Sequence, residues 1–380
     1  MSDPAPAPTS LFRALPGAAF LACSWTWCVG MWLPVYLISD FGAWGWIAFA
    51  VPNVVGAAAV GFVHHTRGAA DEFTARGVEP MRWFSVVTIL FHLGFLGWMF
   101  HEHRPPPAPE WAALTIAPLM LALGAGLSFL GSRAWGWLAM LVLPVAPLLM
   151  GAALVTTYGQ GLATPPLEGT VTNAAALPLY SVGLAFGFLL CPHLDLSILR
   201  VRRETPGVTG DTAFLLGFAG FFLMMIMFTA FYAGGILLGW FSHYLLLHFF
   251  VQGTFTVGAH LRELREHGLP RSLPAPRAVV FVLLALACVG LVPLSARLGV
   301  VLDKPATRVF YESFIWFYAL PFPAAAWFLL TKRRLGAAFW ASVGLATPAM
   351  GAGALLGAWW AIPVAVALPV IAARATPKRP

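Results

Sequence analysis

Long apolar stretches recur along the whole chain, and short polar segments separate them. Each stretch can cross about 30 Å of hydrocarbon as a helix of about 20 residues. Inside hydrocarbon every backbone polar group needs a partner within the protein, which a helix supplies. The sequence therefore predicts an all-α polytopic membrane protein with about twelve transmembrane helices. The predicted spans are 14–38, 42–63, 83–100, 111–130, 135–157, 173–193, 212–233, 237–260, 277–297, 309–331, 335–353 and 355–373.

The composition supports this class. Charged residues make up 10% of the 380 residues and apolar residues 59%, with a mean hydropathy of +0.80. A soluble domain of this length does not show such values, so the predicted partner is the lipid bilayer. The apolar stretch after Arg13 is too long for a signal peptide and is predicted as the first span. The cysteines lie in or beside apolar segments without CxxC spacing and are predicted to be packing residues: Cys23, Cys28, Cys191 and Cys288.

The basic residues predict the orientation of the chain. If the N-terminus is cytoplasmic, all but four of the 22 Lys and Arg residues fall on the cytoplasmic side, as the positive-inside rule requires. The exceptions are Arg104, Arg297, Lys304 and Arg308. The sequence thus predicts a multi-pass protein of the plasma (bacterial inner) membrane with both termini in the cytoplasm. The net charge of +7 follows from this topology and gives no reason to expect a nucleic acid partner.

Two predicted spans carry interruptions, and these decide between two architectures. Span one contains Cys28-Val29-Gly30, and span six contains Cys191-Pro192-His193. The interruptions are five spans apart and so occupy corresponding positions in oppositely oriented halves. This favours a five-plus-five inverted repeat with discontinuous helices 1 and 6 over a six-plus-six parallel repeat.

The corresponding organisation has five parts. They are a tail at 1–13, a first five-helix repeat at 14–157, a second repeat at 158–331, two additional helices at 332–373 and a tail at 374–380. Ala233-Gly234-Gly235 is the predicted turn between spans seven and eight. The segments 64–82 and 261–277 are predicted to be solvated connectors or short surface helices.

The interruption of span six supplies a candidate binding site. Freed backbone groups near Cys191 and His193 can contact a substrate, and Asp195 is a candidate charge for a cation, a proton or a donor on the substrate. The alternative is that Asp195 only caps a cytoplasmic helix at 196–204, whose arginines face lipid headgroups.

Aromatic residues flank the interruption of span one. Trp25 and Trp27 precede Gly30, the predicted break, and could form the walls of a substrate-binding site for a planar or small organic molecule. The alternative is ordinary packing and interface anchoring, because tryptophan is frequent throughout this chain.

Span eight carries polar residues at every fourth position, which places them on one helix face: Tyr244, His248, Gln252, Thr256 and His260. Facing lipid would be costly, so the stripe is expected to face the bundle or a wet cavity, with His248 and Gln252 contacting substrate. The hydroxyls of Thr254 and Thr256 could complete a sodium site with carbonyl groups of span one. The alternative is interhelical hydrogen bonding without a role in transport.

Other intramembrane polar residues have simpler interpretations. His92 is predicted to be a packing residue, Asn53 to stabilise a kink after Pro52, and Glu312 to pair with Arg308 four residues earlier. The ten histidines form no HxxxH or HxxHH cluster, and there is no GxxxxGK[ST] phosphate loop. The sequence therefore predicts no enzyme, no metal site and no cofactor. Without an ATP-binding motif, an ion gradient of Na+ or H+ is the expected energy source for any movement of substrate across the membrane.

The end of span six resembles the amino acid, polyamine and organocation transporter superfamily, whose fold is called the LeuT fold. Distantly, it resembles the nucleobase cation symporter branch, which has Asn-x-x-Asp-aromatic-Ser/Thr-Arg at this place. Asp195 and Ser197 match that pattern, whereas the leading asparagine is missing and Ile198 stands where the family has arginine. The resemblance implies a five-plus-five inverted repeat with substrate between helices one, three, six and eight. Sodium-solute symporters share this architecture and remain an alternative.

These observations predict a secondary active transporter, a sodium- or proton-coupled symporter of a small organic solute that works by alternating access. The alternative is a non-transporting scaffold, sensor or complex subunit on a transporter-like fold. An intramembrane transferase would need a reactive cluster, and Asp40, Glu168 and Asp303 do not form one in the sequence.

Overall fold

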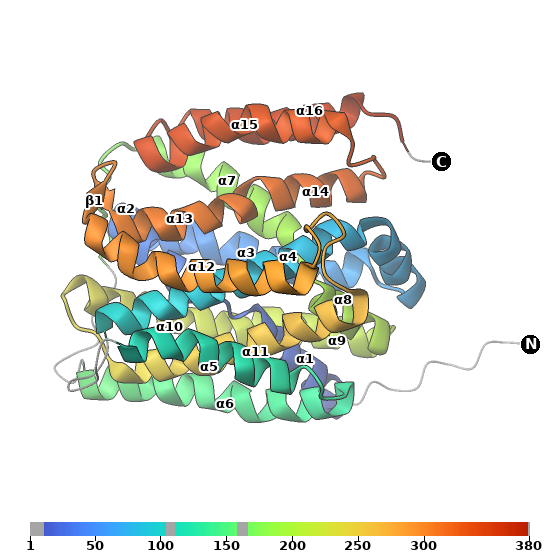
Figure 1. The fold of residues 1–380 in the computed structure, drawn as a ribbon, viewed down its shortest axis with the longest axis horizontal. Coiled ribbons are helices and arrows are strands. Elements are labelled where there is room, and N and C mark those ends of the chain that lie inside the picture. Colours follow the sequence, from blue (N-terminus) through green and yellow to red (C-terminus); the bar gives the residue numbers. More distant parts are fainter. Residues whose placement is uncertain (1–10, 104–110, 158–165, 379–380) are drawn as a thin grey trace, which may run out of the picture.

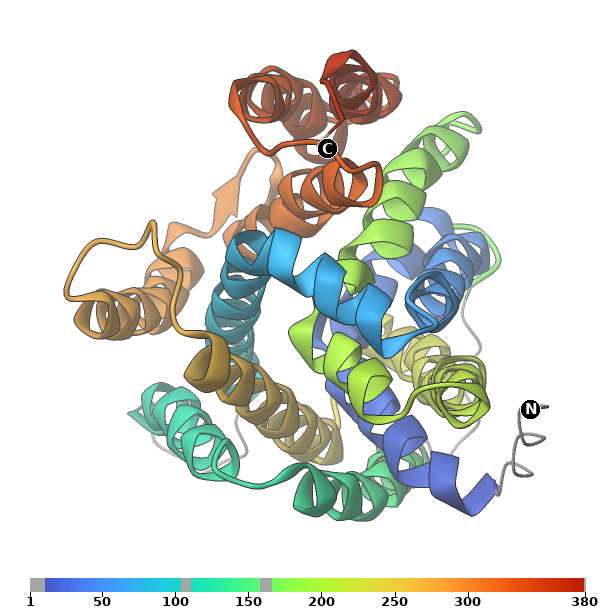
Figure 2. The same cartoon turned by 90° about the vertical axis from the view of Figure 1, so that its right-hand side faces the viewer.

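The computed structural model describes residues 11–103, 111–157 and 166–378 and is a bundle of helices that run along one long axis (Figure 1). The start of the first helix and the end of the last lie at the same end of the bundle. Seen along the axis, the last two helices lie on one outer side (Figure 2). In this part of the chain, strands occur only as a two-stranded hairpin, so the fold class is all-α, as predicted.

The first half of the bundle contains five predicted spans. Its first span consists of two helices, which meet at an angle of 55°. The elements are α1 (Leu11–Trp25), α2 (Cys28–Phe41), α3 (Ala43–Val63), α4 (Arg67–His103), α5 (Trp111–Leu127) and α6 (Ser132–Thr157).

The second half also begins with a broken span. Its elements are α7 (Ala176–Leu190), the 3-10 turn η1 (Cys191–Leu194), α8 (Leu196–Glu204), α9 (Val208–Leu215), the π-helix η2 (Leu216–Phe222), α10 (Leu223–Leu237), α11 (His243–His267), α12 (Arg277–Leu298), the antiparallel strands β1 (Val300–Val301) and β2 (Lys304–Pro305), α13 (Ala306–Ala319) and α14 (Pro321–Leu330). Two further helices follow, α15 (Ala337–Leu356) and α16 (Ala361–Ala375).

The helices account for each predicted span within the described residues. Eight helices are long and apolar enough to cross a membrane, and the bent pair α1 and α2 adds a ninth. The shorter apolar helices α5 and α16 occupy two more predicted spans. The remaining predicted span is the 25-residue helix α11, whose polar stripe lowers its hydropathy. The prediction of a polytopic helical membrane protein is confirmed.

The break in span one lies earlier than predicted. Helix α1 ends at Trp25 and α2 begins at Cys28, so Thr26 and Trp27 form the break and Gly30 lies inside α2. A Cβ on Gly30 would be 3.8 Å from the Phe222 ring, an ordinary contact, so this position does not require glycine. The extended backbone of Trp27, with φ −93° and ψ 170°, changes the chain direction instead.

The break in span six lies where it was predicted. Proline at position 192 cannot donate the backbone hydrogen bond that would continue α7, and the chain turns through η1 before α8 begins. Asp195 has extended backbone angles, φ −80° and ψ 107°, and is the N-cap residue of α8. The side-chain cap proposed as the alternative for Asp195 is therefore present.

Both predicted connectors contain helix. Helix α4 runs from Arg67 without interruption into span three, so only a short turn remains of the segment 64–82. Helix α11 continues to His267, and the non-helical connection 268–276 remains of the segment 261–277. The turn before α11 is also displaced. Gly234 and Gly235 lie inside α10, and Gly239, with φ +83°, provides the turn.

Helix α3 closely approaches α7, the helix that leads into the break of span six. A Cβ on Gly56 of α3 would lie 2.1 Å from the backbone oxygen of Phe188 in α7, so a larger residue does not fit. Glycine at a helix interface allows this contact between backbones.

Candidate functional site

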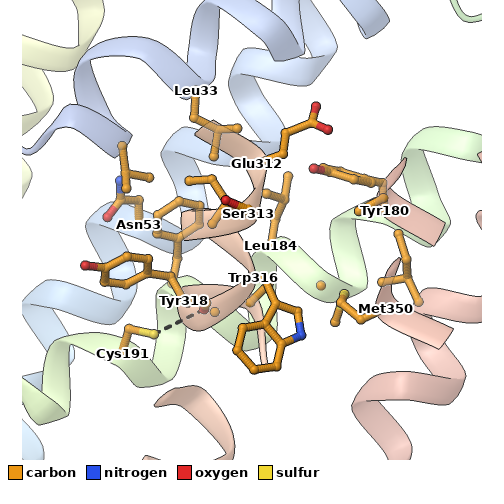
Figure 3. A pocket seen from close by; sticks show the side chains of 18 of the residues that line it. Leu33, Asn53, Tyr180, Leu184, Cys191, Glu312, Ser313, Trp316, Tyr318 and Met350 are labelled. Carbon is orange, nitrogen blue, oxygen red and sulfur yellow. Dashed lines mark hydrogen bonds between the residues drawn. The ribbon is translucent and has the colours of Figure 1, made fainter. Parts of the chain in front are cut away.

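A cavity of about 440 Å³ lies beside both broken spans (Figure 3). Its walls come from the break between α1 and α2, from α3, α7 and η1, and from α13, α15 and α16. Four residues predicted from the sequence to contact substrate line it: Trp25, Trp27, Gly30 and Cys191. A site of this size that is mostly apolar with a few polar groups is typical of small-molecule binding.

Aromatic rings form the wall at the first break. The Trp25 and Trp27 ring centroids are 4.3 Å apart, and Tyr318 from α13 packs edge-on against Trp27 at 5.5 Å. The Trp25 Nε1 donates a 2.8 Å hydrogen bond to Asn53 Oδ1 on α3. Asn53 therefore fixes a ring of the cavity wall, a role that the predicted kink did not suggest.

The break in span one is held by side chains from other helices. The backbone N of Cys28 donates to His92 Nε2 over 3.4 Å, while His92 Nδ1 donates to Thr88 O at 2.7 Å. The Tyr311 hydroxyl donates to Cys28 O at 3.1 Å. The Cys28 N–H, which the break leaves without an intrahelical acceptor, thus finds a partner inside the protein, as a membrane interior requires, and Tyr311 adds a second contact to the same residue. His92, predicted to be only a packing residue, lies at the break.

A network of four charges borders the cavity at Glu312. Its carboxylate is 2.7 Å from Arg308 Nε and 2.9 Å from Lys304 Nζ. Arg308 also pairs with Asp40, at the end of α2, and its guanidinium lies 4.6 Å from the Tyr36 ring centre. The predicted Arg308–Glu312 pair is present, and it belongs to a larger network that joins α2 to α13.

The predicted residues of span six fall into two groups. Cys191 lines the cavity, and its thiol donates to Tyr318 O at 3.2 Å (Figure 3). His193 and Asp195 are buried but do not line the cavity. His193 Nδ1 lies 3.0 Å from His64 Nε2, in a histidine pair between η1 and the end of α3.

Two of the three arginines of α8 do not face lipid headgroups, unlike the alternative proposed for this helix. Arg202 is fully buried and donates to His64 O and Gly207 O, and it pairs with Asp211. Arg200 pairs with Glu263, 2.5 Å from its Nε. Intramolecular acceptors satisfy these guanidinium groups because α8 packs against α4 and α11 rather than lying at the surface.

The polar stripe of span eight faces the bundle interior except at its first member. His248, Gln252, Thr256 and His260 are buried, whereas Tyr244 is 43% exposed. None of the stripe residues lines the cavity, so contact between substrate and His248 or Gln252 stays a prediction. The hydroxyls of Thr254 and Thr256 have no hydrogen-bond partner. Their proposed sodium site likewise stays a prediction.

The sequence did not indicate several residues that line the cavity. They are Asn53, Tyr180, Leu184, Ser313, Trp316 and Tyr318 (Figure 3). These residues share only their location, because each lies on a helix beside a break. Single polar or aromatic residues are too frequent in such helices to predict a binding site from the sequence. Across the described segments, no group of three or more His, Cys, Asp or Glu side chains gathers as a metal site.

Comparison with known proteins identifies the fold. No protein-family model and no curated protein sequence matches the chain. It is similar to the solved structure of Mhp1 in its inward-facing conformation, with 13% identity and a TM-score of 0.53 over 98% of this chain and 94% of that one. A manganese transporter of Eremococcus coleocola matches with 12% identity and a TM-score of 0.52 over 98% and 97% of the two chains.

A Na+-coupled sialic acid symporter in a substrate-bound outward-open state gives a TM-score of 0.51 at 13% identity, over 97% of this chain and 91% of that one. At these identities the similarity concerns the fold alone. The chain has the LeuT transporter fold, which the end of span six had suggested.

Proposed function

We propose that this protein is a secondary active transporter of a small organic solute, and that the solute binds in the cavity between the two broken spans. The observation that carries the proposal is the position of the cavity, whose wall includes Trp27 at the first break and Cys191 at the second. Movement at either break changes the cavity. In many secondary transporters the substrate site lies at discontinuous helices, and alternating access comes from rocking or gating of one group of helices against the other around that site.

The other features that support transport concern fold and topology. The structurally similar proteins are named as a Na+-coupled sialic acid symporter and a manganese transporter. The five-plus-five repeat, the cytoplasmic termini and the plasma membrane location belong to the proposal, supported by breaks five spans apart and by the distribution of basic residues.

The cavity also favours a solute class. Its wall contains one carboxylate, Glu312, and both oxygens of that group already have cationic partners. A charged solute would leave its own charge without a partner in a largely apolar site, which is costly. A solute without net charge that presents an aromatic or apolar face to Trp25, Trp27 and Trp316 fits the wall.

Thermal stability of the purified protein tests binding. The panel contains nucleobases, amino acids, sugars and organic cations, each in sodium and in potassium. A solute at a hundred times its Kd stabilises the native state by about 2.7 kcal/mol. We expect an upward shift for one class of net-neutral solutes.

A matched pair of variants locates the site. Leu184→Trp enlarges a side chain of the cavity wall, whereas Leu286→Trp changes a residue of α12 that is 57% exposed. The first should abolish the solute-dependent shift and the second should retain it. A shift that survives in Leu184→Trp would place the solute elsewhere, and the absence of any shift across the panel would favour the scaffold or sensor alternative.

A further inference from the structure

A second group of polar side chains lies behind the cavity wall, centred on Asp195 and His260. Both residues are fully buried. One Asp195 oxygen, Oδ1, accepts hydrogen bonds from the backbone N of Ser197 at 2.8 Å and of Ile198 at 3.4 Å. The other, Oδ2, has no hydrogen-bond partner and lies 3.9 Å from His260 Nε2, which also has none. Two unpartnered atoms thus face each other inside the bundle.

The arginine residues nearest in sequence to Asp195 do not neutralise it. Arg200 binds Glu263 and Glu266, and Arg202 binds Asp211. An ionised carboxylate would therefore be buried without a cationic partner, whereas a protonated one would be neutral. These surroundings therefore favour the protonated form of the Asp195 carboxyl group.

The His260 imidazole is positioned to accept a hydrogen bond from a protonated Asp195. His260 Nδ1 lies 3.1 Å from the Ser85 hydroxyl on α4, which can accept from an N–H at that atom. Nε2 is then an acceptor aimed at Asp195. Closing the gap between Oδ2 and Nε2 by about 1 Å gives a normal hydrogen bond.

Other titratable groups surround the pair. His92 on α4 and Tyr318 on α13 face it, and Glu263, one turn further along α11, is held by Arg200. From the breaks, Cys28 contacts His92 and Cys191 contacts Tyr318. His193 on η1 is occupied by His64.

We propose that Asp195 and His260 form a proton-binding site, and that this proton is the coupling ion of the proposed transporter. In the loaded state the proton resides on Asp195 Oδ2 and is donated in a hydrogen bond to His260 Nε2. On release it passes to water, and Asp195 remains as a carboxylate. A proton needs only one donor and one acceptor, whereas sodium takes several oxygen ligands, and here an imidazole nitrogen faces the free carboxylate oxygen.

Two residues of the cavity wall connect the Asp195–His260 pair to the cavity. The Trp27 ring lies 5.7 Å from His260, edge-on, and also forms part of the cavity wall. Cys191 is in the same wall, four residues before Asp195. A solute that moves Trp27 or the span-six break therefore changes the surroundings of the proton. This role as coupling ion rests on the proposed function, but proton binding itself does not.

Infrared difference spectroscopy of the full-length protein during a pH titration in potassium buffer tests the site without any solute. We expect a protonated-carboxyl band that appears on acidification and is lost in Asp195→Asn. His260→Gln should move the midpoint of that band. The matched control is Asp303→Asn, because Asp303 is exposed in the β1–β2 hairpin.

Each outcome decides the proposal. A band with unchanged amplitude in Asp195→Asn would overturn it, as would a band that sodium abolishes at constant pH, which would indicate a sodium site. If Asp195→Asn does not fold, the His260→Gln midpoint is decisive, and an unchanged midpoint contradicts the site.

The result separates this inference from the proposed function. Solute uptake without an Asp195 band would refute the proton site alone. An Asp195 band in a protein that binds no solute would refute the transporter and with it the coupling role. If a panel solute binds, its thermal shift should depend on pH in the wild type and not in Asp195→Asn. A shift equally dependent on pH in both would contradict the coupling role.

Discussion

At the scale of single residues, side chains from neighbouring helices hold the first break in place, and His92 accepts the hydrogen bond from an N–H that has no acceptor within the helix. His92 and Tyr311 bond to the backbone of Cys28, and Asn53 holds the Trp25 ring. These three come from α4, α13 and α3, so three different helices fix the geometry of one wall. Buried polar groups that lose such partners are costly, which makes the wall sensitive to single substitutions.

Glu312→Gln tests the charge network beside the cavity. The change leaves Arg308 and Lys304 facing a neutral amide, while only Asp40 remains to balance them. Removing one partner of a fully buried pair costs about 3–5 kcal/mol, and partial exposure of this network reduces the expected loss to about 1–3 kcal/mol. Thermal unfolding in detergent measures the difference in stability.

Glu72→Gln is the matched control for this substitution. Its partner is Arg76 in the same helix, and the Glu72 side chain is 63% exposed, so we expect a loss below about 0.5 kcal/mol. Equal destabilisation by the two variants would show that the network at Glu312 has no special contribution.

At the scale of helices, the close contact between α3 and α7 determines the distance between the cavity walls. A methyl group at Gly56 would overlap the Phe188 backbone oxygen, and backbone cannot move aside as easily as a side chain. The two helices must separate to admit it. The cavity wall formed by Asn53 and Leu184 would move with them.

Gly56→Ala should therefore destabilise the protein by about 1–3 kcal/mol, the usual cost of overpacking. Gly290→Ala in α12 is the control, because nothing lies within 4 Å of its added Cβ, and alanine should stabilise an exposed helix position by up to about 1 kcal/mol. Thermal unfolding of both variants checks the pair. Similar midpoints for the two would contradict the packing argument.

The sequence predicted where the helices lie along the chain better than it predicted which helix faces line the cavity. Hydropathy and Pro192 located the spans and the second break, because both act locally along the chain. Glycine at position 30 suggested the first break in the wrong place, since the true one at Trp27 depends on partners from α4 and α13. The stripe on α11 correctly predicted the burial of all its members except Tyr244, but which buried face meets the cavity depends on how neighbouring helices pack.

At the scale of the whole molecule, the distribution of basic residues predicts which end faces the cytoplasm. In the structure the α11–α12 connection and the β1–β2 hairpin lie at opposite ends of the bundle (Figure 1). The first contains Arg271 and the second Asp303, and both side chains are exposed. The four native cysteines are buried, so they should not react with a bulky reagent.

Labelling of intact cells with a membrane-impermeant maleimide tests this orientation. Asp303→Cys should be labelled from outside, whereas Arg271→Cys should react only after the membrane is opened, because the positive-inside rule places it in the cytoplasm. The native protein without added cysteine is the background control. The reverse labelling pattern would invert the topology.

Solute uptake by proteoliposomes tests directly whether this molecule is a transporter, using the compound that stabilises the purified protein. We predict uptake that saturates with solute concentration, requires an ion gradient and falls at least about tenfold in Leu184→Trp, a loss of about 1.4 kcal/mol or more in apparent binding. The Leu286→Trp variant should transport at the wild-type rate. Uptake that rises linearly and equals that of protein-free vesicles would contradict the claim that this molecule is a transporter.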